Sequence, residues 1–208
     1  MGEVVVTIID YGMGNIKSIR NMLRYLGYDS KISSDAKEIA NSEKLILPGV
    51  GHFGYAMENI SHLGIKEAID YACVERKIPT LGICLGMQLL TNYSEEGKAA
   101  GLGYIDAETK KFDFDRLSGF KIPHMGWDYI NISNRIPLLK NVCDDDRYYF
   151  VHSFYVSVFD KQSKVATTDY GMIFDAVIAK DNIMGVQFHP EKSLKYGMKI
   201  LENFVESY

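Results

Sequence analysis

The residue best placed to do chemistry in this chain is Cys84, at the centre of the stretch PTLGICLGMQLLT. Apolar residues before it predict a buried strand over 80–83, and the residues after it predict a helix over 85–91. Gly82 and Gly86 stand two residues before and after the cysteine, a G-x-C-x-G version of the nucleophile elbow. In such a turn the chain passes so sharply from strand to helix that a Cβ at either glycine would collide with neighbouring backbone.

The predicted turn leaves the sulfur of Cys84 at a helix N-terminus, where unpaired N–H groups favour the thiolate over the thiol. Cys84 is therefore a candidate nucleophile. The motif alone leaves a second interpretation open, because most free cysteines are small buried core residues. A choice between the two requires a base and an orienting group elsewhere in the chain.

An imidazole and a carboxylate follow another apolar strand, 183–188, as His189-Pro190-Glu191. Residues i and i+2 of an extended backbone point to the same side, so the two groups can lie side by side, and proline suits the end of a strand. His189 could then take the proton of Cys84 while Glu191 holds the other ring nitrogen. Alternatively, His189 is a surface histidine and Glu191 caps the last helix. The catalytic interpretation is favoured because open α/β sheets place their sites at the carboxyl ends of strands.

A Cys-His-Glu arrangement implies acyl transfer through a thioester, which requires backbone N–H groups to stabilise an oxyanion. The N–H of Leu85 is one donor by elbow geometry. The glycine-rich loop 48–51 (PGVG) follows the predicted strand 44–47 and is a natural source of the second donor. The same loop could equally be a simple tight turn.

Strands alternate with helices over the first 90 residues, which predicts a mainly parallel sheet with right-handed crossovers. The predicted strands here are 4–9, 28–32, 44–47 and 80–83, and the predicted helices include 16–26 and 65–76. Residues 101–190 instead hold short strand candidates, 110–112, 128–132, 148–158, 165–168, 176–180 and 184–188. We therefore expect an α/β fold in one domain over 1–208: a mainly parallel central sheet flanked by helices, with an added antiparallel strand region and a last helix over 194–208.

The composition argues against several classes of function. The 208 residues are 47% hydrophobic, and a formal net charge of −4 without a Lys/Arg cluster disfavours binding to nucleic acid. No apolar run approaches the roughly 20 residues that cross a bilayer, so we expect a cytoplasmic protein that binds no membrane. Three widely spaced cysteines and five scattered histidines predict no disulfide, metal or cofactor. The loop Gly12-Met13-Gly14 resembles a dinucleotide loop, but the third glycine of that fingerprint would fall at Lys17.

Several motifs in the same order resemble the class I (triad) glutamine amidotransferases, over nearly the whole chain. They are DYGMGN at 10–15, PGVGHF at 48–53, GICLGMQ at 82–88, HMGW at 124–127, YFVHS at 149–153 and GVQFHPEKS at 185–193. Within the family, the pattern is most similar to the glutaminase subunits of imidazole glycerol phosphate synthase. The resemblance implies a glutaminase that hydrolyses L-glutamine and passes ammonia to a separate (β/α)8 synthase/cyclase subunit, as a heterodimer, in histidine biosynthesis.

The resemblance also implies roles for individual residues. Cys84 would be the nucleophile, His189 the base and Glu191 the orienting carboxylate. The oxyanion would contact Val50 or Gly51 and Leu85; glutamine would be held by Gln88, Glu96, Ser153 and Phe154; and the synthase subunit would face Asn15, Trp127, Tyr149 and Lys192. Without the family, Trp127 and Tyr149 are equally well explained by packing in the core or at its rim.

The chain departs from the family pattern at two positions and leaves alternatives open. The family usually has Asn and Tyr where this chain has Asp128 and Phe154, and neither change touches the triad. Some bacteria use a similar pair of subunits to amidinate a surface sugar, which is an alternative acceptor. A cysteine peptidase on the same architecture would give Gln88 and Glu96 no obvious role. A non-catalytic binding module is disfavoured by the complete triad.

Overall fold

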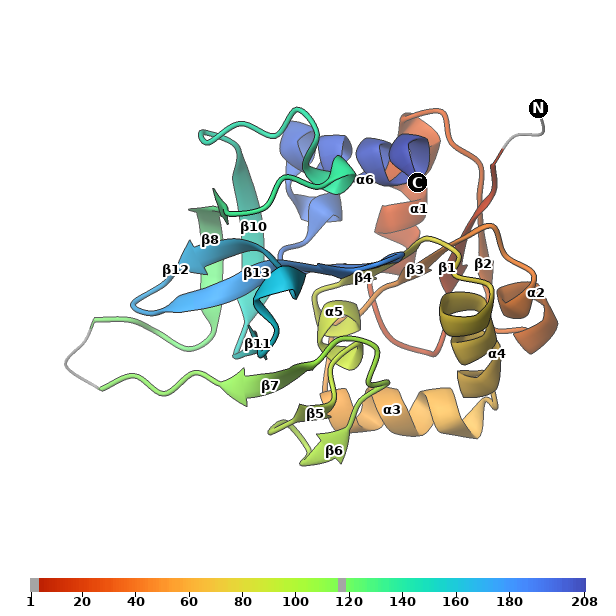
Figure 1. Ribbon diagram of the computed structural model, residues 1–208, viewed down its shortest axis with the longest axis horizontal. Coiled ribbons are helices and arrows are strands. Elements are labelled where there is room, and N and C mark those ends of the chain that lie inside the picture. Colours follow the sequence, from red (N-terminus) through yellow and green to blue (C-terminus); the bar gives the residue numbers. More distant parts are fainter. Residues whose placement is uncertain (1–3, 116–118) are drawn as a thin grey trace.

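The computed structural model describes residues 4–115 and 119–208, and Figure 1 shows the course of the chain. The first half contains β1 Val6–Ile9, α1 Ile16–Tyr25, β2 Ser30–Ser33, α2 Ala36–Ala40, β3 Lys44–Leu47, α3 Phe53–His62, α4 Lys66–Asp70, the π-helical turn η1 Tyr71–Glu75, β4 Thr80–Ile83 and α5 Leu85–Leu89. The second half contains β5 Tyr93–Ser94, β6 Ala99–Ala100, β7 Ala107–Lys111, β8 His124–Tyr129, β9 Asn131–Ile132, η2 Pro137–Leu139, β10 Arg147–His152, β11 Phe154–Val158, η3 Lys161–Ser163, β12 Lys164–Asp169, β13 Ile173–Lys180, β14 Ile183–Val186, η4 Pro190–Lys192 and α6 Leu194–Ser207.

The strands of the central sheet lie in the order β2-β1-β3-β4-β14-β13-β11-β7-β5-β6, with β12 paired to β13 beside this path. The five strands from β2 to β14 in this order run parallel. The next pairs, β14 with β13, β13 with β11 and β11 with β7, are antiparallel. A separate antiparallel sheet consists of β8 and β10. The predicted α/β fold, with a parallel centre and an antiparallel addition, is confirmed.

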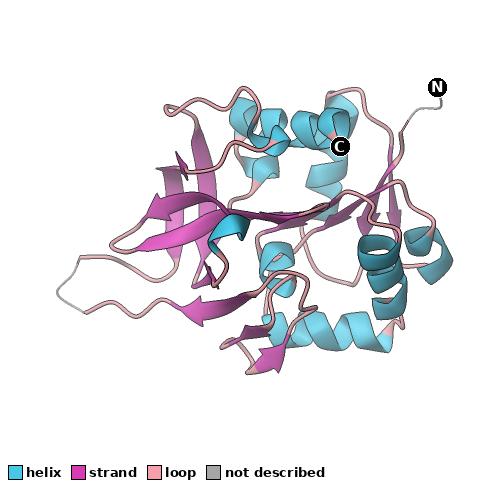
Figure 2. Ribbon diagram, viewed as in Figure 1, coloured by secondary structure: helices cyan, strands magenta, loops and turns pink. Residues whose placement is uncertain are grey.

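Helices cover both faces of the parallel strands, α1 and α6 on one face and α3, α4 and α5 on the other (Figures 1 and 2). Successive side chains of a strand point to opposite faces, so a strand covered on both sides is apolar throughout. On β3, Ile46 packs with residues of α1 and α6, whereas its neighbours Leu45 and Leu47 pack with residues of α3 and α5. The continuous apolar runs of the sequence therefore reflect two hydrophobic cores.

The position of β14 brings together two segments that lie far apart in the chain. It pairs in parallel with β4, and Val186 stands opposite Ile83. Because carboxyl ends of parallel strands meet at one edge of a sheet, the residues that follow β4 and β14 emerge beside each other. Cys84 and His189 are thus brought to the same edge.

The antiparallel region differs from the prediction in one respect that shapes the site. The predicted strand 148–158 is two strands, β10 and β11, which are separated at Ser153 and belong to different sheets. The apolar pattern continues across this break and therefore gives no sign of it. In the first half, helix α3 was not predicted, because it begins within a glycine-rich stretch; the His52 side chain caps it by accepting from the Gly54 N–H. Within the described residues, none of the helices combines the length and apolar character that a membrane crossing requires.

Candidate active site

Cys84 occupies the elbow between β4 and α5 in a left-handed conformation, with φ of 53°. That region is unfavourable for a residue with a Cβ, so the surrounding structure must hold it in place. The Cys84 N–H donates to the carbonyl of Val186 on β14 at 2.8 Å. A Cβ on Gly86 would lie 1.8 Å from the Leu47 carbonyl oxygen, and one on Gly82 would lie 2.7 Å from the backbone of Gly86. The predicted collision at both glycines is confirmed.

His189 and Glu191 form a buried pair at the end of β14. The Nδ1 of His189 lies 2.8 Å from Oε1 of Glu191, and both side chains are 1% exposed. Burial lowers the pKa of His189, but the thiolate of Cys84 and the carboxylate of Glu191 outweigh it and raise the pKa to about 10. The shift favours the protonated form of the His189 imidazole at neutral pH.

The second ring nitrogen of His189 is the one available for proton transfer. Nε2 is buried and makes no hydrogen bond to any of the described residues, and Oε2 of Glu191 is likewise unpartnered. Cys84 raises the pKa of this imidazole through its charge and through a side-chain hydrogen-bonding interaction, although Nε2 has no hydrogen bond of regular geometry among the described residues. Because Nδ1 is held by Glu191, Nε2 can exchange a proton with the sulfur once the two close.

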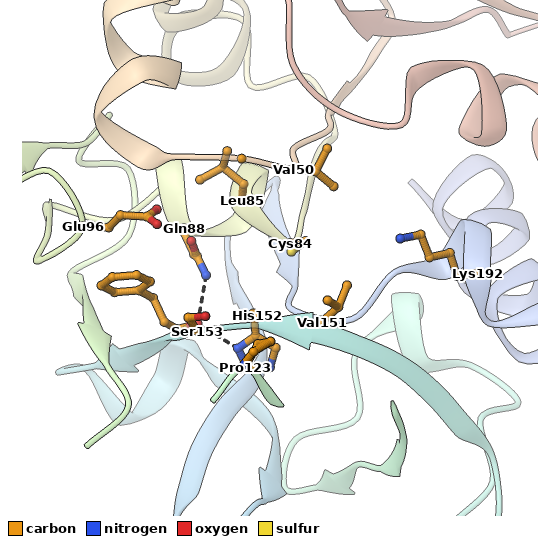
Figure 3. Close-up of a pocket in the computed structure, with 12 residues that line it drawn as sticks. Val50, Cys84, Leu85, Gln88, Glu96, Pro123, Val151, His152, Ser153 and Lys192 are labelled. Carbon is orange, nitrogen blue, oxygen red and sulfur yellow. Dashed lines mark hydrogen bonds between the residues drawn. The ribbon is translucent and has the colours of Figure 1, made fainter. Parts of the chain in front are cut away.

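A cavity of about 480 Å³ opens in front of Cys84, a volume suited to a small-molecule substrate. It is lined by Val50, Gly51, Cys84, Leu85, Gln88, Glu96, Pro123, Val151, His152, Ser153, Phe154 and Lys192. Figure 3 shows Glu96 and Gln88 toward one end, Lys192 at the other, and Cys84 between them. Every residue predicted to contact glutamine or the oxyanion lines this one cavity.

The hydrogen bonds of Gln88 and Glu96 show what these side chains can offer a ligand. Gln88 Nε2 donates to the backbone carbonyl of Phe154 at 3.1 Å and to the side-chain carbonyl oxygen of Gln187 at 3.2 Å. Both amide hydrogens are thereby used, so Gln88 presents an acceptor oxygen. Oε2 of Glu96 accepts from the Phe53 N–H at 2.8 Å, which fixes the carboxylate at the cavity wall. An acceptor and a carboxylate together suit a ligand with an ammonium group.

Comparison with known proteins gives the family of this fold and site. The model of the family "Glutamine amidotransferase class-I" matches residues 7–207. The chain belongs to the class I glutamine amidotransferases. Among its curated relatives is imidazole glycerol phosphate synthase subunit HisH 2 of Methanococcus maripaludis, 50% identical over 202 residues, which cover 97% of this chain and 99% of that protein.

A second relative, subunit HisH of Caldanaerobacter subterraneus subsp. tengcongensis, is 48% identical over 97% of this chain and 98% of that protein. The chain therefore belongs, within the class I glutamine amidotransferases, to the HisH subunits. Among solved structures, that of PurLQS from Thermotoga maritima superimposes with a TM-score of 0.74 at 17% identity and covers 99% of each chain. That likeness shows the common fold.

The amidotransferase residues predicted to face a second subunit lie mostly outside the cavity. Trp127 on β8 and Tyr149 on β10 stand opposite each other in the small sheet, with ring centroids 6.0 Å apart. Lys192 joins this pair to the cavity, because its Nζ lies 5.8 Å from the centre of the Tyr149 ring while the residue lines the cavity. Asn15 lies at the start of α1, a helix that contacts the turn containing Lys192. Trp127, Tyr149 and Lys192 thus lie together, and Asn15 begins a helix that contacts the turn of Lys192.

The loop 48–51 is supported by the DYGMGN segment of the amidotransferase fold. The Tyr11 hydroxyl donates to the Pro48 carbonyl. Gly51 has φ of 122°, a conformation that favours glycine, and a Cβ on it would lie 2.3 Å from the end of the Met13 side chain. The segment with the incomplete dinucleotide pattern therefore packs against the predicted oxyanion loop.

Two residues at the site were not singled out from the sequence. The Gln187 side chain is fully buried beside Cys84, and its Nε2 lies 3.6 Å from the sulfur. His152 lines the cavity and its Nδ1 lies 2.7 Å from the Phe154 carbonyl oxygen. Burial and the neighbouring His124 and His189 lower the pKa of His152 to about 3, so the ring is neutral at pH 7. The parallel pairing of β4 with β14 is the signal that could have identified Gln187.

Among residues 4–115 and 119–208, one group has the spacing of metal ligands: Cys143, Asp145 and Asp146. Asp146 is already paired with Lys199, whose Nζ lies 2.7 Å from its Oδ2. None of the three lines the cavity. The candidate chemistry at Cys84 uses protein side chains and backbone groups, and the sequence-based expectation of no metal or cofactor stays a prediction.

Proposed function

We propose that this chain, as one domain, is a glutaminase that hydrolyses L-glutamine at Cys84 and delivers the ammonia to a cyclase subunit for synthesis of imidazole glycerol phosphate. The observation that carries the proposal is the convergence of three segments at one sheet edge. Cys84 is held in its elbow, the buried His189–Glu191 pair acts on it, and Gln88 and Glu96 line the cavity in front of the sulfur.

Glutamine would bind with its two ends in different parts of the cavity. The carboxylate of Glu96 suits the α-ammonium group, and the oxygen of Gln88 accepts a further N–H. Backbone at Ser153 and Phe154, where β10 breaks from β11, lies beside these side chains and offers groups for the α-carboxylate. The side-chain amide of glutamine then extends toward the sulfur of Cys84.

The reaction would proceed through a thioester. The Cys84 thiolate attacks the amide carbon, and the negative charge that develops on oxygen is stabilised by the N–H of Leu85 and by that of Val50 or Gly51. Protonated His189 gives its proton from Nε2 to the leaving nitrogen, so the C–N bond breaks and ammonia forms. The same imidazole, now neutral, deprotonates a water that attacks the thioester and releases glutamate and the thiolate.

The partner would be a (β/α)8 cyclase subunit that binds the edge formed by Asn15, Trp127, Tyr149 and Lys192. Trp127 is 43% exposed and shares the outward face of β8 with Met125 and Tyr129, both exposed. Exposed aromatic and methionine side chains on one face are typical of a protein interface. Because Lys192 belongs to both this edge and the cavity, ammonia released at Cys84 would leave toward the partner.

An isotope experiment tests the proposal. The chain is co-produced with its cyclase subunit and supplied with glutamine labelled with 15N at the amide, and products are identified by mass spectrometry. We expect glutamate and labelled imidazole glycerol phosphate, and we expect Cys84→Ala to abolish both by several orders of magnitude. If the label appears in an amidinated sugar instead, the acceptor is that sugar and the proposed acceptor is wrong. Release of glutamate by the Ala variant at the parent rate would remove Cys84 from its role.

A further inference from the structure

Gln187 contacts the sulfur of the candidate nucleophile from within the core. It is the first residue after β14, and Cys84 is the first residue after β4, whose last residue, Ile83, stands opposite Val186. Its N–H donates to the Ala176 carbonyl at 2.8 Å, which fixes its backbone on the neighbouring strand β13. The side chain is 0% exposed, and its Nε2 lies 3.6 Å from Sγ of Cys84.

The hydrogen bonds around Gln187 determine which end of its carboxamide faces the sulfur. The Phe154 carbonyl can only accept, so the atom of Gln88 that lies 3.1 Å from it must be the amide nitrogen. The same nitrogen lies 3.2 Å from the Gln187 side chain, whose facing atom must therefore be the oxygen. The nitrogen of Gln187 is thus directed at Cys84 as a donor.

A buried amide N–H needs an acceptor. Within the described residues, Gln187 Nε2 donates to the sulfur of Cys84. A thiolate accepts a hydrogen bond much more strongly than a thiol, because the bond is charge-assisted. We propose that Gln187 is a further catalytic residue, which donates to Sγ of Cys84, favours the thiolate and holds it toward the cavity. The role rests on the proposed function of Cys84 as nucleophile.

The arrangement also links the substrate pocket to the nucleophile. Gln88 lines the cavity and fixes the orientation of Gln187 through a single hydrogen bond. Gln88 is itself fixed by the Phe154 carbonyl, which also lies 2.7 Å from Nδ1 of His152. A ligand that contacts Gln88 therefore acts on the donor that faces the sulfur.

The pH dependence of Cys84 alkylation by iodoacetamide tests the proposal without glutamine or a partner. The measurements use a Cys143→Ser background, because Cys143 is exposed and would also react. We expect Gln187→Leu to move the midpoint of the alkylation profile upward by about one pH unit, as loss of one charge-assisted hydrogen bond should. Gln187→Glu keeps the shape of the side chain and the hydrogen bond from Gln88 but places a carboxylate beside the sulfur. The midpoint of its alkylation profile should therefore move upward by more than that of Gln187→Leu.

Asn203→Leu is the matched control. Asn203 is another buried carboxamide, which donates to the carbonyls of Leu138 at 3.0 Å and Lys140 at 2.6 Å, and none of these three residues lines the cavity. Its loss should destabilise the protein and leave the alkylation midpoint of Cys84 unchanged. If folded Gln187→Glu protein shows the parent midpoint, the proposal is overturned, whether or not Gln187→Leu folds. Glutamine hydrolysis by the parent is measured separately, so failure of the proposed function and failure of this inference are distinguishable.

Discussion

The Nδ1 of His189 lies 2.8 Å from Oε1 of Glu191, and both side chains are withdrawn from solvent. This contact assigns the two ring nitrogens different tasks. Nδ1 is bound to the carboxylate, and Nε2 has no hydrogen-bond partner among the described residues, so it is available for the proposed proton transfers. The same contact contributes to the raised pKa of His189, after the larger effect of the Cys84 thiolate.

Replacing Glu191 by Gln should lower glutaminase kcat by roughly 10²–10⁴-fold, the range expected when the orienting carboxylate of a triad is neutralised. The pKa of His189 should also fall, because the imidazolium loses a charged partner. In the proposed mechanism His189 acts as the acid, so the alkaline limb of the kcat/KM profile should move from near pH 10 to lower pH. Glu206→Gln, which removes a surface carboxylate that accepts from Tyr28, is the control. An unchanged alkaline limb in Glu191→Gln would contradict the assignment.

The left-handed backbone conformation of Cys84 leads to a prediction about stability. Glycine adopts φ near 53° without a steric penalty, whereas alanine retains the penalty of a Cβ. Cys84→Gly should therefore be more stable than Cys84→Ala by about 1 kcal/mol, although both are inactive. Urea denaturation of the two variants measures the difference. Equal stability, or a more stable alanine variant, would show that the elbow carries no strain.

The sequence was sufficient to locate the parallel strands, although not helix α3, and to single out Cys84, His189 and Glu191 as candidates that the fold brings together. Strands β3 and β4 have the predicted bounds, because apolar runs that end in Pro-Gly or Gly-x-Cys leave little freedom in where a buried strand stops. Cys84 and His189 could be paired because each follows such a strand. Their closeness depends on β14 inserting beside β4, and the position of the motifs at strand ends was enough to suggest it.

The features that could not be predicted depend on tertiary pairing. The break at Ser153 separates two strands of similar composition, and only the existence of a second sheet explains it. Gln187 resembles any polar residue at the end of a strand until the pairing of Val186 with Ile83 shows that it follows β14 where Cys84 follows β4. The neutral state of His152 follows from its burial and from His124 and His189, and the rings of Phe112 and Phe174 also pack against it; these four residues are distant from it in sequence.

His152 should make the protein less stable in acid. Its pKa is about 3 in the fold and near 6.5 in the unfolded chain, so between these values the unfolded state binds more protons. Stability should therefore fall as pH decreases from about 6.5 to 3, by at most about 1.4 kcal/mol per pH unit from this residue. Above pH 6.5, His152 does not contribute to the pH dependence of stability.

His152→Gln should flatten this acid dependence, since glutamine can still donate to the Phe154 carbonyl and does not titrate. Urea denaturation at pH 7, 6, 5 and 4 gives the slope for each protein. His62→Gln, at an exposed histidine of α3, is the control and should keep the slope of the parent. If the stability of His152→Gln depends on pH as steeply as that of the parent, other groups cause the acid sensitivity.

Gly86 should tolerate no side chain. A Cβ there would lie 1.8 Å from the Leu47 carbonyl oxygen, which is backbone of β3 and cannot move aside without displacing the strand. Gly86→Ala should cost several kcal/mol of stability or prevent folding, as overpacking against backbone does. Gly54, near the start of α3, is the control, because a Cβ there would meet the His52 ring at 3.3 Å and the Cα of Gly97 at 3.6 Å, both without a severe clash. Gly54→Ala should change stability by about 1 kcal/mol at most, measured by the same denaturation method.

Trp127 should contribute to binding the cyclase subunit without supporting the fold. The ring is 43% exposed and contacts Tyr149 edge to face, so its loss leaves no large cavity. Because exposed aromatic anchors dominate protein interfaces, Trp127→Ala should weaken the complex by about tenfold or more in calorimetric titration. The melting temperature of the isolated chain should change little.

Tyr71 provides the comparison for this interface. It is 50% exposed and lies in η1, which leads into the start of β4, at the opposite edge of the sheet from Cys84. Tyr71→Ala removes a similarly exposed aromatic side chain, so any general effect of lost apolar surface should appear in both variants. If the two bind the cyclase subunit equally well, the face that carries Trp127 is not the interface. If only Trp127→Ala loses affinity, the cyclase subunit binds the face that carries Trp127, which Lys192 joins to the cavity.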